Sequence, residues 1–121
     1  MDYSNKELLE LAAKAAGYKV RYVEAATSFN YQGFLIESKG KYSGLFPVEK
    51  HWNPLTDDGD ALRLAVKLRM RIGIDSIPVG FVVVMSDDPL RKDTHEQIDN
   101  DPYAATRLAI VCAAAEIGKL L

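Results

Sequence analysis

The chain has 121 residues, of which 48% are hydrophobic and 26% charged, and we expect it to form a single globular domain with its own core. Fifteen basic residues stand against seventeen acidic ones, and the net charge of −2 argues against nucleic acid as the default partner. Cys112 is the only cysteine, which excludes an internal disulfide and a cysteine-based zinc site. The polar N-terminal sequence and the absence of an apolar run of ~20 residues predict neither a signal peptide nor a membrane span. We therefore expect a cytoplasmic protein.

The first half of the chain predicts one helix followed by strands. Apolar residues at helical spacing predict a helix over Asn5–Ala16, ended by Gly17. Alternating apolar and polar residues predict strands over Tyr18–Ala25 and Tyr31–Ser38. A short third strand over Tyr42–Val48 is placed at a sheet edge, because it contains a glycine and a proline. The following residues, 49–55, are predicted to form a loop.

A second helix is predicted over Asp57–Met70. Thr56 or Asp57 can cap it, and its apolar stripe continues to Ile72. Gly73 and the polar residues 75–76 then break the helical pattern.

The remaining elements are more apolar. Ile77–Met85 has almost no polar face, so we expect a central strand covered on both sides. Asp93–Ile98 predicts a short return strand. A final helix is predicted over Pro102–Lys119, with Asn100 or Asp101 as its cap, and it is apolar nearly all round.

These elements predict an α+β fold in the order α-β-β-(β)-α-β-(β)-α. We expect an α/β sandwich, with one small mixed or antiparallel sheet of about three to five strands and three helices packed on it. Helices on both sheet faces, or one face closed by a dimer, would cover the apolar strand and the final helix. A homo-oligomer formed through the alanine-rich helix or an edge strand is expected.

Two segments carry a resemblance to a known family. Trp52–Leu68 (WNPLTDDGDALRLAVKL), together with the C-terminal Asp101–Val111 and Ala113–Gly118, resembles small accessory proteins of tailed phages and prophages, grouped as phage α-β-α sandwich domains. Leu11–Gly17 fits the same pattern. Relatives continue the final helix as Arg-Arg-Ala-Ile-Val-Arg, whereas residues 107–112 here read RLAIVC. The family has no established activity, and the resemblance implies a phage-borne protein acting in a bacterial cytoplasm.

Three carboxylates, Asp57, Asp58 and Asp60, gather at the start of the second predicted helix. They could bind a hard cation or act as paired catalytic carboxylates, but capping and interaction with the helix dipole is the favoured interpretation. His51 and His95 could hold zinc with a carboxylate, although their spacing matches no known metal motif. We therefore expect no metal and no cofactor.

Aromatic and basic residues offer a second kind of site. Trp52 beside His51 could form a platform for a ring, and its alternative role is that of a core residue. Arg63, Lys67 and Arg71, with Arg107, could bind an anion, and the alternative is a solvated helix face.

No catalytic constellation is present in the sequence, so we expect a non-enzymatic binding protein that blocks a host protein or sequesters a small anionic ligand such as a nucleotide. One alternative is a small metal-dependent hydrolase or nucleotide-processing enzyme that uses Asp57, Asp58, His51 and His95. Another is a structural or virion-associated protein.

Overall fold

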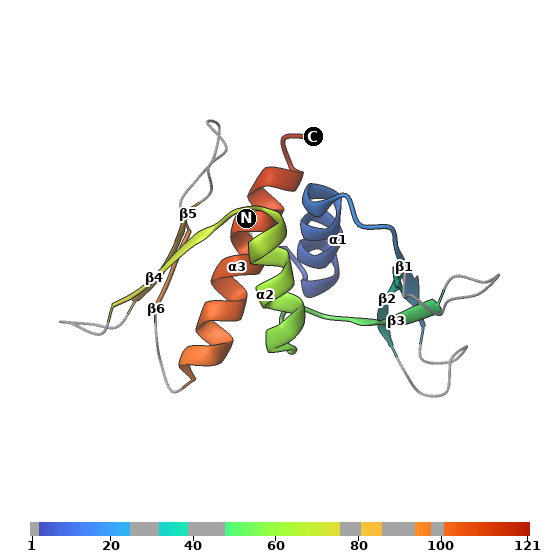
Figure 1. The fold of residues 1–121 in the computed structure, drawn as a ribbon, viewed down its shortest axis with the longest axis horizontal. Helices are drawn as coiled ribbons and strands as arrows, with labels where there is room; N and C mark the ends of the chain where they lie inside the picture. The colour runs from blue at the N-terminus through green and yellow to red at the C-terminus, as the bar shows by residue number, and fades with distance from the viewer. Residues whose placement is uncertain (1–2, 25–31, 39–47, 76–80, 86–93, 98–100) are drawn as a thin grey trace.

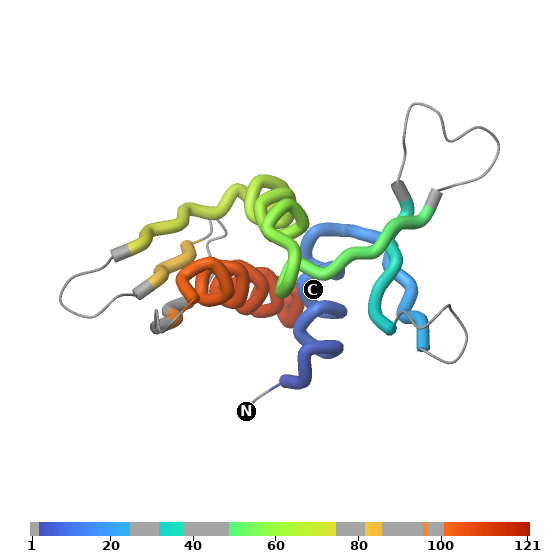
Figure 2. The backbone as a smooth tube through the Cα atoms, turned by 90° about the horizontal axis from the view of Figure 1, so that it is seen from below, coloured from blue at the N-terminus to red at the C-terminus, as the bar shows by residue number. Residues whose placement is uncertain are grey.

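Three helices form a central layer, with a three-stranded antiparallel sheet on either side, in a computed structural model that describes residues 3–24, 32–38, 48–75, 81–85, 94–97 and 101–121 (Figure 1). The view turned by 90° shows the same arrangement, with helices between the two sheets (Figure 2). The α+β class and the three helices are confirmed. The prediction of one sheet is wrong, because the described strands before the second helix form one sheet and those after it form another.

Helix α1 spans Asn5–Ala16, as predicted. The Ser4 side chain accepts a hydrogen bond from the Glu7 backbone N–H, which caps the first turn. Gly17 ends the helix in the left-handed conformation, at a φ of 72° that a side chain would disfavour. The chain then turns directly toward the first sheet.

The first sheet has the strand order β1-β2-β3, from β1 (Val20–Val23), β2 (Gly33–Ser38) and β3 (Val48–Trp52). Its register sets Tyr22, Phe34 and Trp52 side by side on one face. Phe34 and Trp52 are buried in the core, so this face packs toward the helices.

The third strand is at an edge, as predicted, but it lies later in the chain than expected. The predicted loop over 49–55 is wrong for Glu49–Trp52, which pair with β2. Asn53 and Pro54 are outside the strand, as predicted, and β3 ends at Trp52 directly before them. Residues 42–47 of the predicted strand lie outside the described residues.

Helix α2 spans Asp58–Lys67 and is shorter than predicted. Arg69 adopts a left-handed φ of 53°, which turns the chain out of the helix. The helical pattern is broken before Gly73, but Arg71–Asp75 forms strand β4, which the sequence did not predict. Arg71 therefore lies on a strand and not on the α2 face that carries Arg63 and Lys67. Ile72 belongs to this strand and does not extend the helical stripe.

The second sheet has the order β4-β5-β6, with β5 at Phe81–Met85 and β6 at Thr94–Gln97. The central position of β5 and the return strand are confirmed over 81–85 and 94–97, and residues 77–80, 93 and 98 of these predicted strands lie outside the described residues. Val82 and Val84 of β5 are fully buried in the core cluster that also holds residues of all three helices, so they lie on the face of the sheet that packs toward the helices. The described helices lie on only one face of each sheet, so the prediction of helices on both faces is wrong.

Helix α3 spans Pro102–Gly118, with Asp101 as its N-cap and Pro102 in the first turn. It packs against α1, α2 and the second sheet, which explains why it is apolar nearly all round. Its end approaches α1 so closely that a Cβ at Gly118 would collide with the backbone carbonyl of Leu11. This glycine permits the close packing of the two helices.

Candidate ligand-binding site

The start of α2 is held by its own carboxylates. Asp57 accepts a hydrogen bond from the Asp60 backbone N–H at 2.7 Å, which is N-cap geometry. Asp60 is buried and accepts a hydrogen bond from the Asn53 backbone N–H at 2.9 Å. Asp58 accepts one from Arg107. These carboxylates are engaged in shaping the turn that leads from β3 into α2.

Trp52 is buried to 2% exposure and anchors an aromatic cluster. Its ring lies edge-on to Tyr18, with 5.9 Å between centroids, and edge-on to Phe34 at 6.4 Å. The face of Trp52 is therefore not available to a ligand, and the residue acts as a core anchor. Tyr18 is the half-buried member of this cluster and is accessible to solvent.

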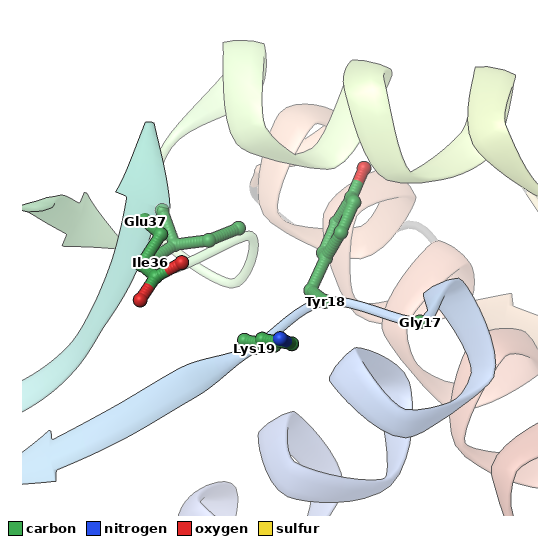
Figure 3. Close-up of a pocket in the computed structure, with 5 residues that line it drawn as sticks. All are labelled: Gly17, Tyr18, Lys19, Ile36 and Glu37. Carbon is green, nitrogen blue, oxygen red and sulfur yellow. The ribbon is translucent and has the colours of Figure 1, made fainter. Parts of the chain in front are cut away.

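A concave surface surrounds Tyr18, between the end of α1, the first sheet and α2. We call it the Tyr18 hollow. One part has a volume of about 340 Å³, and the adjoining part about 220 Å³, and both parts include Tyr18, Ile36 and Glu37. Figure 3 shows the Tyr18 ring with its hydroxyl directed toward α2, and with Ile36 and Glu37 across the hollow on β2.

Charged side chains of both signs line the hollow. Lys19, Lys50 and Arg63 provide three positive charges. Glu37 and Asp60 provide two negative ones, and Asp60 is already bonded to Arg63 Nη2 at 2.7 Å. Arg63 also lies 3.7 Å from Asp57 Oδ2, so its guanidinium is engaged by two carboxylates. Among the described residues that line the hollow, Lys19 and Lys50 are therefore the basic groups with which an anion would pair, and Glu37 is the carboxylate that would oppose it.

The electrostatics at Tyr18 follow from the same neighbours. Burial raises the pKa of the Tyr18 hydroxyl above its usual value, Arg63 opposes this rise, and Asp60 adds to it. The hydroxyl is thus neutral at physiological pH and can donate a hydrogen bond. The hydrogen bond to Asp60 raises the pKa of the Arg63 guanidinium, which stays charged.

The predicted site residues divide into two groups. Trp52 and Arg63 both line the Tyr18 hollow. His51 does not, because it pairs with Leu35 on the opposite face of the sheet from Trp52. Lys67 is exposed in the last turn of α2, and Arg107 lies on α3, where it binds the carbonyl oxygen of Leu55.

Sequence reasoning missed Tyr18, Lys19 and Lys50 as site residues. Tyr18 was assigned to a strand, and Lys50 to a loop. The signal that could have found Lys50 is its alternation with Trp52, since residues two apart in a strand share a face. No comparable signal joins Tyr18 to β2, because that contact depends on how the sheet packs.

Among the described residues, no group of three His, Cys, Asp or Glu side chains is arranged to hold a metal ion. The predicted partner of His51, the side chain of His95, lies outside what the structure describes. Within the same part of the chain, no helix has both the length and the apolarity needed to cross a membrane. Compared with protein-family models, curated proteins and solved structures, the chain matches none of them.

Proposed function

We propose that this protein is a non-enzymatic binding protein that holds a small anionic ligand with a ring, such as a nucleotide, in the Tyr18 hollow. The observation that carries the proposal is the placement of a half-buried tyrosine ring beside Lys19 and Lys50, with Arg63 held nearby by Asp60. Tyr18 offers a ring edge and face for stacking, and Trp52 behind it keeps the ring in place. Lys19 and Lys50 supply charge for a phosphate or carboxylate.

The arrangement supports binding better than catalysis. Asp57 and Asp58, the carboxylates named for a hydrolase, are bonded to a backbone N–H and to an arginine at the start of α2. A carboxylate already engaged in this way is poorly placed to activate water. The phage origin implied by the sequence resemblance remains a prediction, and a sequestering protein would be consistent with it.

The test is native mass spectrometry of the purified protein, followed by titration with a panel of nucleotides monitored by calorimetry. We expect an adduct that leaves unchanged on denaturation, or binding of at least one nucleotide. Replacing Tyr18 by Leu keeps the bulk and removes the ring, and should weaken binding about tenfold, the loss of roughly one stacking contact.

A charge-matched pair of variants locates the site. Lys50→Gln should weaken binding about tenfold, because it removes a charged donor from the hollow. Lys67→Gln makes the same change on the exposed end of α2, outside the hollow, and should leave the affinity within about twofold. Equal effects of the two variants, or no binding by any nucleotide and no adduct, would refute the proposal.

A further inference from the structure

A second concave surface lies on the other side of α2 and shares no residue with the Tyr18 hollow. We call it the β4 groove. It has a volume of about 300 Å³ and lies between α2, the first half of α3 and β4. Its apolar lining comes from Leu62, Ile72, Ile74, Tyr103 and Ile110.

Much of this lining is open to solvent. Leu62 is 61% exposed, Ile74 63% and Tyr103 70%. Val66, one turn after Leu62 on α2, is 69% exposed. Three large apolar side chains of the groove lining are thus exposed, with Val66 next to them on α2, and exposed apolar surface of this kind marks an interaction site.

Strand β4 borders this groove and is an edge strand. Within the part of the chain that the structure describes, it has a strand neighbour on one side only, β5. Ile72 and Ile74 pair with the buried Val84 and Val82, so they lie on the face of the sheet that looks toward the helices. The other edge of β4 offers backbone groups to a further strand.

We propose that a second copy of this chain binds there, with the two β4 strands pairing antiparallel about a two-fold axis at Gly73. The strand reads Arg71-Ile72-Gly73-Ile74-Asp75. Centred on Gly73, this register sets each Arg71 opposite Asp75 of the second copy, and each Ile72 opposite Ile74. Such a contact is isologous, since the same segment serves both partners.

The charge pattern selects this register. With a two-fold axis perpendicular to the sheet, residues directly opposite each other in the two β4 strands lie on the same face. Because faces alternate along a strand, one β4 strand can shift relative to the other only by two residues at a time. A slip in either direction places Gly73 opposite one charged residue and removes both cross-strand ion pairs. Opposite charges directly across a strand pair stabilise it, and like charges destabilise it.

The apolar residues favour the same occupant. Pairing about Gly73 joins the two second sheets into one, with the helix layers of both copies on the same side. The exposed Ile74 of each copy then meets Ile72 of the other, and the strand of the second copy lies against the open side of the β4 groove. A single contact thus pairs the free edge of β4 and covers its exposed Ile74.

The experiment measures mass against concentration by sedimentation equilibrium. We expect the wild-type protein to move from 13.4 kDa toward twice that mass as its concentration rises. Arg71→Asp alone and Asp75→Arg alone each set like charges opposite one another twice per dimer, and each should weaken dimerisation about tenfold or more. The double variant with both changes restores opposite charges and should return to within about threefold of wild type.

Circular dichroism establishes that each variant is folded, and a second measurement needs no variant. Hydrogen exchange of the backbone amides at 71–75 in the wild-type protein should slow as concentration rises, because the second copy protects them. A monomer at all concentrations, a dimer indifferent to both single reversals, or exchange at 71–75 independent of concentration would each overturn the proposal. Nucleotide binding is untouched by these outcomes, since the Tyr18 hollow is a separate surface.

Discussion

The buried carboxylate of Asp60 accepts a hydrogen bond from the backbone N–H of Asn53, seven residues earlier, at 2.9 Å. Its other oxygen accepts one from Arg63 Nη2 at 2.7 Å. One side chain thus ties the end of β3 to the first turn of α2 and also orients a basic residue of the Tyr18 hollow. The stability of the turn and the geometry of the hollow depend on the same carboxylate.

Asp60→Ala should lower the free energy of unfolding by about 3 kcal/mol, because it leaves the Asn53 N–H without its buried acceptor and removes a charged hydrogen bond. Urea denaturation measures the loss. Asp57→Ala is the control, since it removes an exposed helix cap and a long, exposed ion pair to Arg63, and should cost about 1 kcal/mol. Equal losses for the two variants would show that Asp60 is no more than a second cap.

Arg107 connects α3 to the same turn. Its Nε donates to the Leu55 carbonyl oxygen at 2.8 Å and its Nη1 to Asp58 Oδ1 at 2.6 Å, and the side chain is 17% exposed. Lysine cannot reproduce both bonds, so Arg107→Lys should destabilise the fold by about 1–2 kcal/mol. Asp58→Asn removes only the charge of the exposed partner and should cost under about 0.5 kcal/mol in the same urea assay. An Arg107→Lys variant with an unchanged free energy of unfolding would show that the two hydrogen bonds of Arg107 do not stabilise the fold.

Local signals were sufficient to predict the helices. Ser4 and Gly17 bound α1 as capping preferences require, and Asp101 with Pro102 starts α3. These contacts lie within a few residues in the sequence, so they can be read without knowing the fold. The end of α2 was missed because Arg69 takes a left-handed conformation that a non-glycine residue seldom adopts.

The division into two sheets could not be predicted in this way. Both β3 and β4 are short edge strands. Each is stabilised by pairing with its neighbouring strand, and the intrinsic strand propensity of its own residues is too weak to predict it. The candidate site depends on the same long-range pairing. Tyr18, Ile36 and Lys50 meet only because β2 lies between β1 and β3, with Lys50 opposite Ile36.

Replacing Gly118 by alanine has two opposing effects on stability, one on helix propensity and one on packing. Alanine is favoured over glycine within a helix by about 1 kcal/mol. A Cβ at this position would meet the backbone carbonyl of Leu11, and a backbone cannot move aside without separating α1 from α3. We expect packing to prevail, so that Gly118→Ala destabilises the protein by about 2 kcal/mol in thermal or urea unfolding.

Gly59→Ala is the matched control for this prediction. Its Cβ would lie 3.1 Å from the guanidinium nitrogens of Arg63 and 3.3 Å from Asp57 Oδ2, which are the ends of flexible side chains. These can shift, so Gly59→Ala should be neutral or stabilising by up to about 1 kcal/mol. If Gly118→Ala were also stabilising, the two helices would have to be less tightly packed than the structure shows.

Cys112 should be a poorly reactive thiol. Burial raises its pKa to about 11, with Glu96 and Glu116 adding to the shift. Because the thiolate is the reacting species, modification of the native protein by a disulfide reagent at pH 8 should be at least about tenfold slower than modification in urea. A native rate equal to the unfolded rate would place the thiol in an open, solvated position.

The same shift predicts a dependence of stability on pH. The pKa is higher in the folded state than the ordinary value of 9.0, so the unfolded chain ionises first as the pH rises. The contribution of Cys112 to stability is therefore complete below about pH 9 and is lost progressively toward pH 11. Cys112→Ala should remove this component, so the difference between the unfolding free energies of wild type and variant should change across that interval. Tyrosines and lysines also titrate there, but they are common to both proteins, so their contribution cancels in the comparison.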